Sequence, residues 1–173
     1  MVEITISVVL QIIQTVSLVV GIIYYLTIMR NSQENQKQAL ETRQAQLYMT
    51  LHETRRSPEF QKQWYKTAFL DEWESYEDYL NKYGPENDFE SYAEHGSIYQ
   101  FYDGIGFLLK KKIIDLSYID DNLRHSILLI WDRHESIING NRRRLNRPHL
   151  WKHFEYLVNE IQEYHEKHTE LNP

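Results

Sequence analysis

Cysteine is absent from this chain of 173 residues, and glycine and proline are scarce, with 6 and 4 residues. The lack of cysteine excludes disulfides, thiolate zinc sites, iron–sulfur clusters and cysteine nucleophiles. So few glycines and prolines argue against a many-turned β-architecture and favour long helices. Lysine and arginine are also missing from residues 1–29, whose only charged side chain is Glu3. We therefore expect a helical protein with an unusual leading segment.

The chain is rich in side chains that can be buried. Aromatic residues make up 13% of it, including 13 tyrosines and 4 tryptophans. This content is enough to build a folded core, and the length allows a membrane segment plus one modest domain. The formal net charge of -6 gives no reason to expect nucleic-acid binding.

The leading segment contains the run LQIIQTVSLVVGIIYYLTIMR, and no charged residue lies between Glu3 and Arg30. A helix of about 20 residues already crosses the hydrocarbon core of a bilayer. A cleaved signal peptide would need a basic start, a shorter apolar core and small residues at its end. This run ends instead in Tyr24-Tyr25-Leu26-Thr27. Residues 1–30 are thus predicted to be a transmembrane anchor.

The positions of basic residues predict the orientation of this anchor. Arg30, Lys37 and Arg43 follow the apolar run, whereas none precedes it. By the positive-inside rule the C-terminal part lies in the cytoplasm and the short N-terminus outside. We expect a single-pass protein of the cell inner (plasma) membrane, with the lipid bilayer as its first partner.

Polar and small residues recur along one stripe of the anchor, at Ser7, Gln11, Gln14 and Gly21. Their spacing of three to four residues, or two turns, places them on one helix face. Glutamines facing another helix can hydrogen-bond across the interface, at about 0.6 to 2 kcal/mol per bond. The stripe predicts packing against a copy of the chain or another membrane protein. The alternative is that both amides snorkel towards the outer surface.

Residues 31–57 follow as a predicted juxtamembrane stalk. The stretch is polar, and no glycine or proline interrupts it before Pro58. A narrow a/d-like seam suggests helix pairing and consists of Leu40, Leu47, Leu51 and Thr54. The competing interpretation is a solvated helix whose last turns join the core of the domain, and two heptads are too few to displace it.

Residues 58–173 are predicted to form a cytoplasmic bundle of four to five helices. Ser57 and Pro58 suit a helix start, and Gly84-Pro85 suits a helix end. No strand-like alternation appears, so the fold class is all-α. The expected helices span about 58–68, 71–83, 88–112, 115–140 and 146–167. Phe60, Trp64 and Phe69 are the predicted core anchors of the first.

Two stretches carry a family resemblance: IYQFYDGIGFLLKKKIIDLSYIDDNL and LLIWDRHESIINGNRRRLNRPHLWKHFEYLV. They resemble an uncharacterised prokaryotic group, domain-of-unknown-function family 4760. The similar elements include Phe101-Tyr102-Asp103, Trp131 and Arg142–Arg144. The resemblance covers nearly the whole chain and implies a membrane helix, a helical stalk and a compact helical domain. It implies no catalytic residue.

The sequence contains no complete metal-binding or catalytic motif. His149 and His153 form an i,i+4 pair, and His165 and His168 an i,i+3 pair, but no third ligand or zinc motif accompanies them. The carboxylates of residues 71–78 fit the solvent-exposed face of one helix. No nucleophile elbow, phosphate loop or dinucleotide fingerprint occurs. We expect neither enzymatic activity nor a metal or cofactor.

The most distinctive polar feature is an arginine cluster at a helix-to-helix junction, made of Arg142, Arg143, Arg144 and Arg147. These arginines have three possible roles: pairing with acidic neighbours and the preceding helix end, contacting anionic lipid or an acidic partner, or binding a phosphorylated ligand.

Together these features predict a membrane-anchored, non-catalytic interaction or accessory protein, oligomeric or part of a membrane complex. The alternative is a ligand-gated membrane effector whose arginine cluster senses a phosphorylated, nucleotide-type ligand.

Overall fold

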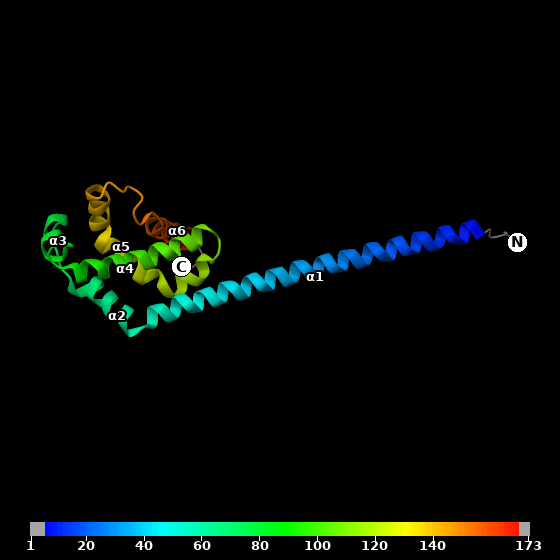
Figure 1. Ribbon diagram of the computed structural model, residues 1–173, viewed down its shortest axis with the longest axis horizontal. Coiled ribbons are helices and arrows are strands. Elements are labelled where there is room, and N and C mark those ends of the chain that lie inside the picture. Colours follow the sequence, from blue (N-terminus) through cyan, green and yellow to red (C-terminus); the bar gives the residue numbers. More distant parts are fainter. Residues whose placement is uncertain (1–5, 170–173) are drawn as a thin grey trace. The chain divides into compact units, whose positions relative to one another are not determined.

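A computed structural model describes residues 6–169, with the side chains of Asp121, His168 and Thr169 left aside. The described part is helical throughout, with turns but no strand, which confirms the predicted all-α class. Figure 1 shows the order of the elements along the chain. The elements are α1 (Ile6–Arg56), α2 (Pro58–Tyr65), the π-helical turn η1 (Lys66–Leu70), α3 (Tyr76–Tyr83), α4 (Phe89–Lys110), α5 (Leu116–Arg144) and α6 (Lys152–Thr169).

The chain divides into two compact units, residues 1–45 and 46–173. Within the described residues, the first unit consists of α1 alone, and no residue of that helix is buried. Its N-terminal part is the one described helix with the length and apolar composition needed to cross a membrane. A signal sequence would pass the same test. The structure therefore establishes a long apolar helix near the N-terminus.

The second unit starts inside α1, because the helix runs without a break as far as Arg56. Tyr48 and Leu51 pack against the core of this unit, and the ring of Tyr48 lies 5.7 Å from that of Tyr118. The last turns of α1 are thus part of the domain, as one of the two interpretations of the stalk expected.

Side-chain caps begin most of the shorter helices. The Ser57 hydroxyl accepts a hydrogen bond from the Phe60 amide at the start of α2, where Pro58 occupies the first turn, as predicted. Asp88 caps α4 and Asp115 caps α5, at the residues where the sequence analysis started these two helices. Asp71 does not start α3. Ser75 does, because its hydroxyl accepts from the Asp78 amide.

Two predicted boundaries near the C-terminus are wrong. Helix α5 does not stop at Gly140 but runs on to Arg144, and α6 starts at Lys152 and not near Asn146. Asn146 and Trp151 have positive φ angles of 51° and 52°, which a right-handed helix does not accommodate. A short irregular segment therefore separates the two helices.

The core of the domain forms where α6 packs along α4, with α5 and α2 adding to it (Figure 1). Gly106 permits the close approach, since a Cβ at that position would overlap the His153 carbonyl of α6. Large apolar side chains of these helices are fully buried, namely Ile98, Ile105, Ile119, Ile127, Ile130, Phe154, Leu157 and Ile161. The prediction that Phe69 is a core anchor is wrong, because this side chain is half exposed.

Candidate functional site

The arginine cluster occupies the last turn of α5 and the segment after it. Arg142 is mostly buried and makes an ion pair with Glu155 at 2.9 Å. Its guanidinium also donates to the Leu150 carbonyl at 2.8 Å and to the Asn139 side chain at 3.1 Å. These bonds fasten the irregular segment to α5 and α6, so Arg142 is used by the fold itself.

Arg144 contacts Tyr92 of α4. Its guanidinium donates to the Tyr92 hydroxyl at 3.1 Å and lies over the Tyr92 ring. Arg144 also lines a pocket of about 190 Å³ beside the turn at Gly84. The exposed side chains of Arg143 and Arg147 make no hydrogen bond or ion pair within residues 6–169. The structure therefore does not bring the four arginines into one site.

The predicted packing stripe of α1 is exposed along its length, at Ser7, Gln11, Gln14 and Gly21. Nothing lies within 4 Å of a Cβ built on Gly21, so this position has room for a neighbouring helix. The packing itself stays a prediction.

The histidine pairs do not form joint sites in the described structure. His149 is exposed, while His153 contacts the Asp103 carboxylate at 3.3 Å. His165 lies 2.8 Å from Asp120, and the side chain of His168 is outside the described residues. Among the described residues no three potential ligands gather around a common point where a metal could sit.

The sequence analysis missed a buried polar network built from two other histidines. His95 of α4 and His134 of α5 are both fully buried. His95 lies 2.8 Å from the Asp71 carboxylate and 3.0 Å from the Tyr79 hydroxyl. Ring nitrogen Nδ1 of His134 is hydrogen-bonded to the Tyr99 hydroxyl, and its Nε2 lies 3.0 Å from the Thr67 carbonyl.

The donors around His134 can be assigned from the chemistry of its partners. A carbonyl only accepts, so Nε2 of His134 carries a proton and donates to Thr67. Burial lowers the pKa of His134 to about 3, and the nearby His95 and Arg133 contribute smaller decreases. The hydrogen bond to Thr67 acts in the opposite direction and raises this pKa. The ring is therefore neutral and its Nδ1 accepts from Tyr99.

Tyr99 gives its single proton to His134. Burial raises the pKa of both Tyr99 and Tyr79, which keeps them protonated. The Tyr79 hydroxyl is hydrogen-bonded to Nδ1 of His95, and Nε2 of His95 is hydrogen-bonded to the Asp71 carboxylate. The His95 and His134 rings lie 5.5 Å apart, so the two sets of bonds are neighbours in the core.

Trp73 separates this network from solvent. Its ring lies 4.7 Å from the His134 ring and 5.4 Å from the Tyr79 ring. The Arg133 guanidinium lies over the Trp73 ring, 5.2 Å from the ring centroid, and it donates to the Asp71 carbonyl. A polar pocket of about 410 Å³ is lined by Glu72, Trp73, Glu74, Lys82 and Arg133. The pocket therefore reaches Trp73, while the two histidines behind it are committed to bonds within the core.

Two buried donors or acceptors of this region have no hydrogen-bond partner among the described atoms. They are the Thr67 hydroxyl and Nε of Arg133. Both residues belong to the segments that surround Trp73, since Thr67 lies in η1 and Arg133 precedes His134 on α5. The ring nitrogens of both histidines are thus hydrogen-bonded, whereas these two neighbouring polar atoms are not.

One signal in the sequence could have located the two histidines. His95 precedes the buried Tyr99 by one helical turn, and His134 precedes the buried Ile138 by the same spacing. Each histidine therefore falls on the apolar stripe of its helix, where a titratable side chain needs a buried partner. The identity of that partner is not visible in the spacing.

A third pocket, of about 210 Å³, lies where α1 meets α2 and is lined by Arg55, Arg56, Phe60, Gln61, Trp64 and Tyr65. It is more apolar than the pocket beside Trp73 and combines aromatic rings with two guanidinium groups. The sequence analysis used Phe60 and Trp64 only as core anchors and gave Arg55 and Arg56 no role.

Fold and sites together define a class: an all-helical protein with a long apolar N-terminal helix and a domain whose two buried histidines are hydrogen-bonded within its core. The family model described as "Domain of unknown function (DUF4760)" matches residues 5–161. The chain belongs to this family, which confirms the resemblance found in the sequence. Comparisons with curated proteins and with solved structures found no match.

Proposed function

We propose that the protein is a membrane-anchored, non-catalytic interaction protein that presents its helical domain at the cytoplasmic membrane surface. The observation that carries the proposal is the unburied apolar part of α1. Valine, leucine and isoleucine side chains there are about half exposed on every face, including Val9, Ile13, Val16 and Ile23. Exposed apolar surface of this extent calls for a membrane or a protein cover, and the length matches a bilayer.

The continuity of α1 supports an anchor over a removable signal sequence. The helix runs on from the apolar part through Arg30 and the polar stretch to Arg56. A cleavage site requires an extended segment with small residues, and no such break occurs in this helix. Arg30, Lys37 and Arg43 support the orientation with the domain in the cytoplasm.

The bonding of the polar groups supports a non-catalytic role. His95 and His134 are the most deeply buried titratable bases, and each is engaged by two groups of the core. A general base must reach a proton of the substrate, and these rings lie behind Trp73. We therefore assign them to the architecture of the domain.

Carbonate extraction of membranes from cells that express the full chain tests the anchor. The protein is expected in the membrane pellet, with an intact mass that includes residues 1–30. Protease added to sealed spheroplasts should leave the domain uncut, because it faces the cytoplasm. Release into the carbonate supernatant, or a mass lacking the first 30 residues, would contradict the anchor.

A second candidate function, the ligand-gated effector, is favoured by the exposed positions of Arg143 and Arg147. These two guanidinium groups are the members of the cluster that the fold leaves available, and Arg144 lines a pocket nearby. Thermal unfolding of the full chain in detergent, with and without nucleotides and polyphosphate, separates the two functions. The effector predicts a rise in melting temperature that Arg143→Ala with Arg147→Ala abolishes, and the interaction protein predicts no shift.

A further inference from the structure

The junction of α2 and η1 exposes apolar side chains that an amphipathic helix would bury. The π-helical turn from Lys66 to Leu70 directs Thr67 and Ala68 into the domain. Phe69 and Leu70 are 52% and 72% exposed as a result, and Tyr65 is 56% exposed. Wide turns of this kind occur frequently at functional sites. Because Phe69 and Leu70 break the local apolar pattern and remain at least half exposed, a functional reason is indicated.

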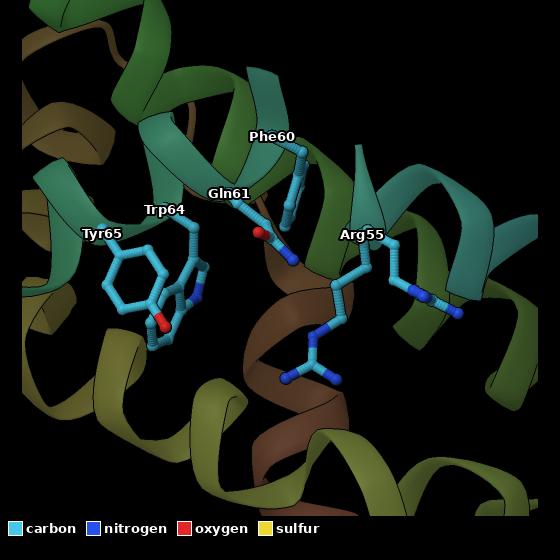
Figure 2. Close-up of a pocket in the computed structure, with 6 residues that line it drawn as sticks. Arg55, Phe60, Gln61, Trp64 and Tyr65 are labelled. Atoms are coloured by element: carbon cyan, nitrogen blue, oxygen red, sulfur yellow. The ribbon is translucent and has the colours of Figure 1, made fainter. Parts of the chain in front are cut away.

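These side chains lie next to the pocket between α1 and α2. Figure 2 shows Tyr65 and Trp64 side by side at one end, Arg55 at the other, and Gln61 with Phe60 between them. Phe60 is nearly buried and forms the floor. The indole nitrogen of Trp64 donates to Tyr102 at 2.9 Å, which fixes that ring. The ring of Phe69 lies 5.7 Å from Trp64 and extends the aromatic surface beyond the pocket.

The charge of this groove is opposite to that of the chain as a whole. Two arginines line it and no acidic residue does, although the chain carries a net charge of -6. Arg55 uses one guanidinium nitrogen to donate to the Asn122 carbonyl at 3.0 Å, which holds its side chain in place. Arg56 makes no hydrogen bond or ion pair with the described part of the chain. Both therefore retain donors for an incoming anion.

We propose that this groove, formed by Arg55, Arg56, Phe60, Gln61, Trp64 and Tyr65, binds an acidic amphipathic segment of a partner protein. The inference rests on the proposed role as an interaction protein and names its contact surface. Carboxylates of the segment pair with the two guanidinium groups, whose fork matches a carboxylate. Its apolar side chains cover the Trp64 and Tyr65 rings and the neighbouring Phe69. Tryptophan, tyrosine and arginine are the residues that dominate binding energy at protein interfaces.

The shape of the groove favours a polypeptide over a lipid surface. Its concave floor at Phe60 accepts a side chain, and the Gln61 amide offers both a donor and an acceptor to a peptide backbone. Anionic lipid needs only basic charge on an accessible face. A site with a fixed indole, a nearly buried floor and an amide is more specific than that.

A charge-reversal experiment tests the proposal. The full chain is placed in phosphatidylcholine nanodiscs and titrated against two fluorescent helical peptides, one with glutamate and leucine on opposite faces and one with lysine in place of glutamate. Wild-type protein is expected to bind the glutamate peptide at least tenfold more tightly. Arg55→Glu with Arg56→Glu should reverse the preference, since the groove then attracts lysine.

A matched control reverses two positive charges outside the groove. Lys111→Glu with Lys152→Glu changes two exposed lysines outside the groove and should leave the preference for the glutamate peptide within twofold of wild type. The proposal is overturned if neither peptide binds, if both bind equally, or if the control loses the preference as completely as the groove variant. Carbonate extraction reports separately on the anchor, so a soluble protein with an intact peptide preference would refute only the proposed function.

The occupant in cells is identified with a photo-crosslinking phenylalanine in place of the exposed Lys62, on the same helix as the groove. An adduct whose crosslinked peptide is acidic and amphipathic, and which Arg55→Glu with Arg56→Glu abolishes, supports the proposal. An adduct with lipid, an adduct with a second copy of this chain, or no adduct overturns it.

Discussion

The isoleucines of α1 and of α5 are the same side chain in opposite surroundings. Ile13 and Ile23 of α1 are 55% and 58% exposed, whereas Ile127 and Ile130 of α5 are fully buried. Burying such a side chain is worth about 1.5 to 3 kcal/mol. In α5 the other helices of the domain provide that burial. The described chain provides no such burial for the isoleucines of α1. Helical structure alone therefore does not show whether apolar side chains are buried within the protein.

The sharpest test of this comparison places the same charge in both helices. Ile127→Lys should unfold the domain, because an unpaired ammonium in a packed core costs more than about 4 kcal/mol. Ile13→Lys should leave the domain folded but weaken membrane insertion by about 3 kcal/mol. Circular dichroism melting of the full chain in detergent and carbonate extraction measure the two effects. If Ile13→Lys also abolished the melting transition, the two regions would not be independent.

A smaller effect is expected where α4 meets α6. Gly106→Ala should destabilise the domain by at least about 2 kcal/mol, because the new methyl group overlaps the His153 carbonyl and the helices must separate. Gly104→Ala is the control, two residues away on the exposed face with nothing within 4 Å of the added Cβ. It should be neutral or stabilise by up to about 1 kcal/mol. Denaturant unfolding compares the two, and equal losses would contradict the close approach.

The burial of His134 predicts that the stability of the domain depends on pH. His134 has a pKa of about 3 in the folded state and 6.5 in the unfolded state. Between these values only the unfolded chain binds the proton, so this contribution is complete above pH 6.5 and is lost as pH falls towards 3. The loss is about 1.4 kcal/mol per unit, or about 2 kcal/mol from pH 6.5 to 5.

Unfolding free energies measured at several pH values test this dependence. His134→Gln lowers stability at pH 7 and should flatten the slope between pH 5 and 6.5. His149→Gln, at an exposed position, should keep the slope of the wild-type protein. A slope unchanged in His134→Gln would mean that another group is responsible.

The smallest expected effect concerns the polar stripe of α1. Gln11→Leu alone should reduce crosslinked oligomers about three- to thirtyfold, because one amide bond across helices contributes about 0.6 to 2 kcal/mol. Ile12→Leu with Val16→Leu changes other faces of the helix and should have little effect. Chemical crosslinking in membranes measures both, and unchanged crosslinking in the glutamine variant would remove the packing hypothesis.

Local signals predicted most of the helices correctly. Ser57, Asp88 and Asp115 each cap the helix that the sequence placed after them, because a capping side chain bonds to an amide only two or three residues away. The start of α3 was misplaced at Asp71, whose carboxylate bonds instead to His95. An aspartate before an apolar run is a good cap by pattern alone, and its partner 24 residues away is invisible to that pattern.

The candidate sites were less predictable than the helices. Arg142 belonged to a conspicuous cluster, yet its bonds to Leu150 and Glu155 make it part of the fold. Arg55 and Arg56 look like an ordinary basic helix end, and only the return of α2 places aromatic rings beside them. A cluster along the chain therefore does not predict a cluster in space.

The sequence by itself determined the all-helical class, the long apolar helix and most helix starts, because these depend on composition and on interactions within about one turn. The tertiary structure alone decided that His95 bonds to Asp71 and Tyr79, that His134 bonds to Tyr99, and that Phe69 faces solvent beside two arginines. These residues come from different segments of the chain. Their meeting depends on how whole helices pack, which no short stretch of sequence encodes.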